Sequence, residues 1–115
     1  MAMHEVGIME QTLAIALQKA KEQGANQIHR IKMTVGADSG VAVEALEFAF
    51  DVVVAGTIAA KAKFEIDYLP VRCYCQHCNQ EFEPKTWFYE CPQCGEPSLD
   101  IRQGRELELT SLEVS

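Results

Sequence analysis

The chain contains a pair of C-x2-C units, Cys75–Cys78 and Cys91–Cys94, with residues 79–90 between them. Each unit curls the backbone so that both of its sulfurs reach one ion, and two units complete a tetrahedral four-cysteine zinc site. Gly95 follows the second unit and permits the tight backbone that such a turn needs. This spacing predicts a small, metal-stapled module whose closed ligand shell leaves no position for catalysis.

Alternatives to this ligand set involve the neighbouring residues. All five cysteines of the chain lie within residues 73–94, which is typical of metal binding rather than of a disulfide framework. One C-x2-C unit also suits a redox dithiol or a disulfide, although two at this spacing rarely do. Cys73 competes with Cys75 as the first ligand, but with Cys78 it would form the less symmetric C-x4-C. We expect His77, inside the first unit, to be a solvent-facing turn residue, because four thiolates already complete the site.

Two segments show the apolar periodicity of amphipathic helices. Gly24 ends the first and Gly56 ends the second. The start of the second is poorly marked, because Val43 stands where a capping side chain is expected. The apolar stripes are Met9, Leu13, Ala16, Leu17 and Ala20 in the first, and Leu46, Ala49, Phe50, Val53 and Val54 in the second.

Three segments, residues 31–35, 64–68 and 107–114, alternate apolar and polar side chains and are predicted strands with one buried face. In the third, the apolar side chains shift from odd to even positions, so a regular strand would place them on opposite faces. A β-bulge near Ser111 would direct both pairs of apolar side chains toward the core. Those pairs are Leu107 with Leu109, and Leu112 with Val114.

This order of elements predicts an α+β fold, in which two helices pack on a small, three-stranded, mostly antiparallel sheet. The zinc-ribbon-like four-cysteine module is expected as an insertion between the second and third strands. Pro70 marks its entry and the turn at residues 95–97 marks its exit. We therefore expect one domain from residues 1–70 plus 98–115 and a zinc-binding domain from residues 71–97.

The charge balance argues against one class of partner. Lys and Arg number 10 against 17 Asp and Glu, a net charge of −7, whereas binding to nucleic-acid phosphates requires clustered positive charge. No apolar run approaches the roughly 18 residues that span a bilayer, and no basic segment precedes an apolar one at the chain start. We expect a cytoplasmic protein with no membrane or nucleic-acid partner. No Ser/His/Asp set or open zinc position indicates an enzyme.

Several separated motifs together resemble the HypA family, the nickel-insertion accessory proteins of NiFe-hydrogenase maturation. The resemblance covers the chain from Met3 to Val114. The motifs that carry it are Met3-His4-Glu5, Val35-Gly36, Ser39-Gly40-Val41, the segment 44–51 leading to Gly56-Thr57, the paired cysteine units and the final segment 107–114.

The resemblance implies a nickel-binding α/β domain that carries a zinc domain. It assigns nickel to the imidazole of His4 with backbone nitrogens near Met3, and nitrogen-rich tetragonal geometry suits Ni(II). It matches Glu5 to a residue that completes or steers the nickel site, although Glu5 would equally favour the positive end of the first helix. Relatives often carry an acid where this chain has Ala42. The implied zinc ligands are Cys75, Cys78, Cys91 and Cys94.

The implied function is that of a nickel metallochaperone, with Zn(II) structural and Ni(II) transported. It would deliver nickel to the precursor of the hydrogenase large subunit, with an accessory GTPase as the other partner. Some relatives also serve urease. The chain has no G-x4-G-K-[ST] loop, so nucleotide energy must come from elsewhere. The alternatives are a zinc-ribbon module for nucleic-acid binding or regulation, and a metalloenzyme with an open site.

The start of the chain influences the expected nickel site. In the family the chain starts at the Met that matches Met3, whereas here Met1 and Ala2 precede it. Removal of Met1 would make His4 the third residue. The terminal amine, two amide nitrogens and the imidazole would then surround Ni(II) in a square plane. If Met1 is retained, we expect this chelate to be lost and nickel binding to weaken.

Overall fold

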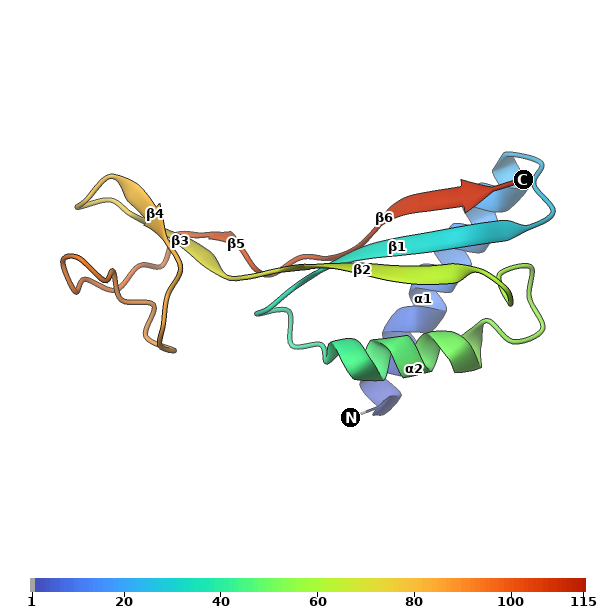
Figure 1. Ribbon diagram of the computed structural model, residues 1–115, viewed down its shortest axis with the longest axis horizontal. Coiled ribbons are helices and arrows are strands. Elements are labelled where there is room, and N and C mark those ends of the chain that lie inside the picture. Colours follow the sequence, from blue (N-terminus) through green and yellow to red (C-terminus); the bar gives the residue numbers. More distant parts are fainter. Residues whose placement is uncertain (1) are drawn as a thin grey trace.

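The computed structural model describes residues 2–115, with side chains from residue 4 onward. The molecule is elongated, 54 × 29 × 17 Å, with a three-stranded sheet toward each end (Figure 1). The elements in chain order are α1 (Ala2–Glu22), β1 (Ile28–Gly36), α2 (Val43–Val53), β2 (Lys63–Leu69), β3 (Arg72–Cys75), β4 (Gln80–Phe82), β5 (Ile101–Gln103) and β6 (Leu107–Val114).

Helices α1 and α2 cover one face of the larger sheet (Figure 1). The predicted apolar stripes form this core: Met9, Ala16 and Ala20 of α1 are fully buried, as are Leu46 and Ala49 of α2. The predicted pairing of two amphipathic helices with a small sheet is therefore confirmed. Among the described residues, neither helix has the length and hydropathy that crossing a membrane requires.

The larger sheet has the order β2-β1-β6, so the first strand of the chain lies at its centre. β1 runs parallel to β2 and antiparallel to β6. The parallel pair is possible because α2 provides the crossover between β1 and β2. In the second sheet, β3 pairs antiparallel with both β4 and β5. Most of the strand pairings are thus antiparallel, as the sequence predicts, with β1 and β2 as the exception.

The predicted change of step in β6 is present. The register with β1 shifts between Ser111 and Leu109, which leaves Thr110 as the extra residue of a β-bulge. Leu109 and Leu112 consequently both pack against the core. Leu107 is less buried than expected, because it remains 37% exposed.

The second sheet carries the cysteine module and has a small core of its own. Cys73 and Phe82 are buried there, and Ile101 packs against them. Ile101 belongs to β5, which pairs with β3. This sheet therefore includes residues beyond the predicted exit at residue 97.

The two sheets are joined at the carboxyl end of β1. A Cβ atom at Gly36 would overlap the carbonyl oxygen of Gly104, so only glycine permits this close approach. The backbone N–H of Asp38 donates to the same carbonyl oxygen at 2.7 Å, and that of Ala37 donates to Leu69 at 2.8 Å. Leu69 and Gly104 lie on the two segments that connect the sheets. These contacts therefore hold both segments against the carboxyl end of β1.

A side-chain contact also links the cysteine module to the larger sheet. The Tyr89 hydroxyl donates to Asp38 at 2.7 Å, and Arg105 lies 3.6 Å from the same carboxylate oxygen. The hydrogen bond to this carboxylate raises the pKa of Tyr89, because ionisation would remove the donor and place two negative charges together.

We expect Tyr89→Phe to loosen the orientation of the module while both sheets remain folded. The loss of one partly exposed hydrogen bond should cost about 1 kcal/mol. Residual dipolar couplings measured by NMR should then no longer fit a single orientation of the two sheets. Tyr74→Phe is the matched control, because its hydroxyl contacts Asn79 within the module. Equal loosening in both variants would contradict a linking role for Tyr89.

Candidate metal centres

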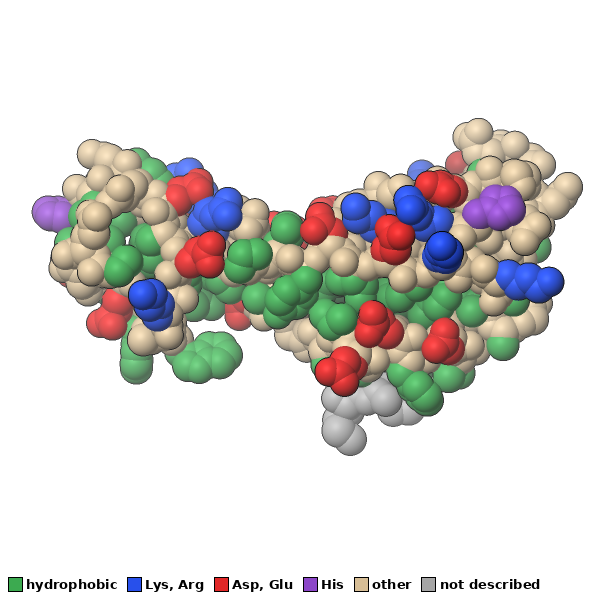
Figure 2. All heavy atoms as spheres, in the orientation of Figure 1, with side chains coloured by type: hydrophobic (Ala, Val, Ile, Leu, Met, Phe, Trp, Pro, Cys, Tyr) green, Lys and Arg blue, Asp and Glu red, His purple; other side chains and the backbone are tan. Residues whose placement is uncertain are grey.

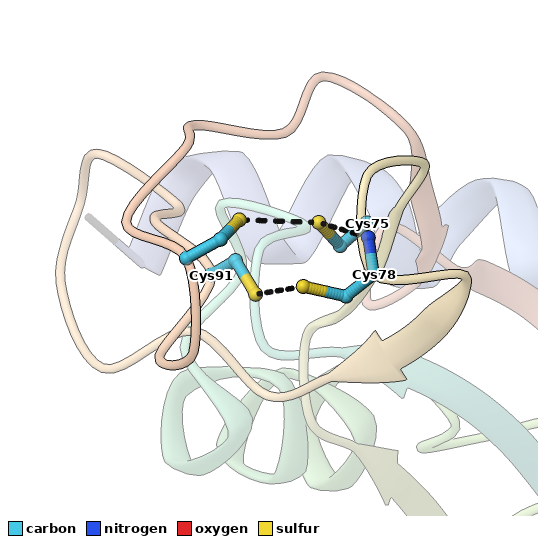
Figure 3. A group of neighbouring side chains, drawn as sticks. Cys75, Cys78 and Cys91 are labelled. Atoms are coloured by element: carbon cyan, nitrogen blue, oxygen red, sulfur yellow. Dashed lines mark hydrogen bonds between the residues drawn. The ribbon is translucent and has the colours of Figure 1, made fainter.

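The two cysteine units bring four sulfurs together at the end of the second sheet. The sulfurs of Cys75, Cys78, Cys91 and Cys94 all lie within 4.8 Å of one another. Two of the pairs, Cys75 with Cys94 and Cys78 with Cys91, are 3.6 and 3.9 Å apart. Figure 3 shows the side chains of both units pointing toward a common centre. Four sulfurs held about 2.3 Å from a zinc ion would lie about 3.8 Å apart in a tetrahedron. The donor set therefore fits a tetrahedral ion of this size.

Electrostatics explain why such a cluster needs a cation. Backbone N–H groups of Cys94 and Gln93 lower the pKa of Cys91 to about 7, which favours its thiolate. Burial and the neighbouring sulfurs raise the pKa of Cys78 to about 12. Several thiolates at this spacing repel one another unless a divalent ion neutralises them. The Cys91 thiolate, which ionises first, can therefore bind a metal ion. The bound cation then lowers the pKa of the other three thiols, so that they also ionise.

The backbone around the second unit supports this geometry. Gly95 has a positive φ of 77°, and its N–H donates to the carbonyl of Cys91 at 2.8 Å. The Cys91 N–H donates in turn to the carbonyl of Glu96 at 2.9 Å. Gly95 thus occupies the tight turn that the sequence assigns to it.

The two residues that competed for a place in this group lie outside it. Cys73 is fully buried in the second core, and burial raises the pKa of its thiol. His77 is exposed at the turn of the first unit. Among the described residues, neither Cys73 nor His77 belongs to the group of side chains whose ligand atoms converge.

The residues predicted to hold nickel lie in the first turn of α1. His4 is exposed, whereas Glu5 is buried with its carboxylate directed at the start of α2. The two neighbours therefore face different surroundings. The predictions that concern Met1 and the side chains of Ala2 and Met3 lie outside the described residues.

Glu5 forms the contact that the start of α2 lacks locally. Ala42 occupies the N-cap position of α2, and no side-chain capping bond accompanies it. Instead, the Ala42 N–H donates to Glu5 Oε2 at 3.1 Å. A carboxylate at this point also meets the positive end of the α2 dipole. Glu5 therefore stabilises the beginning of α2, rather than acting only at its own helix.

This role was not predicted, although the sequence contains its signal. A helix whose start has no capping residue needs an acceptor from elsewhere in the chain. The Asp38–Tyr89 contact was also missed, and it has no comparable signal, because 51 residues separate its partners.

The contact of Glu5 predicts a pH dependence. The Ala42 N–H lowers the Glu5 pKa below its ordinary value of 4.5, because it stabilises the carboxylate. The stabilisation of the α2 start is therefore complete above pH 4.5 and is lost as the pH falls through the lowered value. In nickel-free protein, the Ala42 amide resonance should titrate with a midpoint below 4.5. In Glu5→Gln this titration should vanish, and its persistence would show that another group acts on Ala42.

Comparison with known proteins shows which family the chain resembles. Residues 3–114 match the family described as hydrogenase/urease nickel incorporation, metallochaperone, HypA. The hydrogenase maturation factor HypA of a Picosynechococcus species is 50% identical over 112 residues, covering 97% of this chain and 99% of the relative. The HypA of Acidithiobacillus ferrooxidans is 38% identical over the same shares of both chains.

Solved structures agree over nearly the whole fold. The solution structure of the Ni metallochaperone HypA from Helicobacter pylori is 26% identical with a TM-score of 0.67, covering 96% of each chain. A second solution structure of a HypA protein is also 26% identical with a TM-score of 0.72, covering 98% of this chain and 97% of the other. The chain belongs to the HypA family of hydrogenase and urease nickel-incorporation metallochaperones.

Proposed function

We propose that this chain binds Ni(II) at its N-terminus and delivers it during maturation of NiFe-hydrogenase. The family match over residues 3–114 is the observation that carries the proposal. The chain acts as a metallochaperone rather than as a catalyst. Its two metals have different roles, since one is structural and the other is cargo.

Zinc is the proposed occupant of the four-cysteine group. Four thiolates in a tetrahedron are typical of structural zinc sites, and they leave no position for an exchanging ligand. The module has few buried apolar residues, so the metal supplies the stability that its core does not. We propose that this zinc domain is an insertion in the nickel-binding domain, with β5 as part of its sheet.

Nickel is the proposed cargo of the first turn of α1. The imidazole of His4 is exposed and accessible to an incoming ion. The first N–H groups of a helix have no carbonyl partners within it, so backbone nitrogens near Met3 are available as further donors. Imidazole and backbone nitrogens suit Ni(II) in tetragonal geometry. Glu5 supports the nickel site either as a ligand or through the hydrogen bond that it accepts from the Ala42 N–H.

The proposed partners are the precursor of the hydrogenase large subunit and an accessory GTPase, and the proposed location is the cytoplasm. An exposed site at a helix end exchanges its metal more readily than a closed thiolate site. This difference in accessibility is what a transfer protein requires. The net charge of −7 counts against the alternative of a nucleic-acid-binding zinc ribbon.

Metal analysis of purified protein, followed by nickel titration, tests the proposal. We expect one zinc that survives dialysis and one nickel that a competing chelator removes without loss of zinc. Nickel that enters only when zinc leaves would overturn the assignment of two separate sites. Salt-dependent binding of DNA or RNA would instead support the alternative function.

A further inference from the structure

The outward face of α2 is unusually apolar for a surface helix. Its inward face is buried through Leu46, Ala49 and Phe50. On the outward face, Phe48 is 62% exposed and Val52 is 54% exposed. A helix that is apolar on both faces is normally covered on both. Among the described residues, α1 and the larger sheet cover only one of these faces, so the outward face has the character of a contact surface.

The charges on this face all have one sign. Glu44, Glu47 and Asp51 are exposed on α2, and the helix contains no Lys or Arg. Figure 2 shows acidic and hydrophobic side chains over α2, while basic side chains lie over the neighbouring sheet and on the cysteine module. We call the set Glu44, Glu47, Phe48, Asp51 and Val52 the α2 outer face.

A groove extends this face toward the sheet. It has a volume of about 780 Å³ and lies between the first turns of α2 and the end of β2. Val41, Ile66 and the half-exposed Tyr68 provide apolar lining, and Glu44 and Glu47 form its acidic rim. No basic side chain is among the lining residues that the structure describes. Apolar lining and an acidic rim therefore continue from the α2 outer face into a concave surface.

The negative charge of the α2 outer face limits the kind of partner that can bind there. A second copy of this chain would meet the same face across a two-fold axis, which would bring three carboxylates against three more. A nucleic acid or an anionic membrane would be repelled for the same reason. We propose that the α2 outer face and its groove bind an amphipathic helix of another protein, with apolar side chains along its centre and Lys or Arg on its flanks.

This inference goes beyond the nickel site and does not depend on it. The groove includes Ala42, whose N–H is held by Glu5 at 3.1 Å, and Glu5 follows His4 in the chain. A helix bound there would lie beside the first turn of α1. Docking and metal binding are nevertheless separate properties, and the first is measured without nickel.

The test uses a synthetic amphipathic helix of leucine and lysine, titrated into the zinc-loaded full chain without nickel. Amide shifts in NMR spectra should change in residues 41–52, and the same peptide with glutamate in place of lysine should not bind. The triple variant E44Q/E47Q/D51N should weaken binding about tenfold at low salt. The matched control E10Q/D67N/E108Q changes the net charge equally at other exposed positions and should alter binding less than about twofold.

An apolar pair of variants separates docking from simple charge attraction. Phe48→Ser should weaken binding about tenfold, whereas Ile15→Ser, at a 50% exposed position of α1, should leave it unchanged. Circular dichroism checks that all variants remain folded. Equal weakening by the two charge variants, no effect of Phe48→Ser, or shifts confined to other elements would each overturn the proposal.

Discussion

Replacing Cys91 with alanine is expected to release zinc and unfold the cysteine module, while α1, α2 and the β2-β1-β6 sheet remain folded. Structural zinc contributes on the order of 10 kcal/mol in small modules, which have no other comparable source of stability. The larger core is separate, since its buried residues all come from the segment 9–59. Zinc content measured by mass spectrometry and amide dispersion measured by NMR should therefore change only for the module.

Cys73→Ala is the matched control for this experiment. Cys73 is equally buried but lies outside the four-sulfur group, so its loss should weaken the packing and leave zinc content unchanged. Loss of zinc from Cys73→Ala with retention in Cys75→Ala would show that the ligand set is wrong. Unfolding of the larger sheet in Cys91→Ala would show that the two parts do not fold independently.

The second large effect is expected at the other metal site. His4→Ala should abolish specific nickel binding, with little change in melting temperature or zinc content. The side chain is exposed, so its removal leaves the core intact. Calorimetric titration with nickel measures the loss. Acidification should also release nickel from the wild-type protein, because a protonated imidazole cannot coordinate a metal.

Two other exposed histidines provide the controls. His29 lies on β1 beside Ser115, and His77 lies in the turn of the first cysteine unit. His29→Ala and His77→Ala should both keep the nickel stoichiometry and affinity of the wild type. Unchanged nickel binding in His4→Ala, or its loss in His77→Ala, would contradict the N-terminal assignment.

Local patterns were sufficient to predict most of the fold. The stripes of α1 and α2 specify which faces are buried, because helical periodicity is a property of neighbouring residues. The bulge in β6 was predictable for the same reason, since a change of step between Leu109 and Leu112 leaves few other ways to bury both. The convergence of the four sulfurs follows from the spacing of the cysteines.

What sequence patterns did not predict depends on contacts between distant segments. The central position of β1 and its parallel pairing with β2 follow from how α2 crosses the sheet. The inclusion of β5 in the second sheet depends on its pairing with β3 rather than on its own short sequence. The burial of Glu5 at Ala42 requires α1 and α2 to be packed first. A charged residue in a first turn is otherwise expected at the surface.

We propose that zinc and nickel occupy separate sites with different donors. X-ray absorption spectra at the zinc and nickel edges of the protein loaded with both metals distinguish the two donor sets. We expect four sulfurs at about 2.3 Å around zinc, and only nitrogen and oxygen donors around nickel. Nickel surrounded by sulfur, with zinc in a nitrogen-rich environment or absent, would show that nickel binds at the cysteine module and not at the N-terminus.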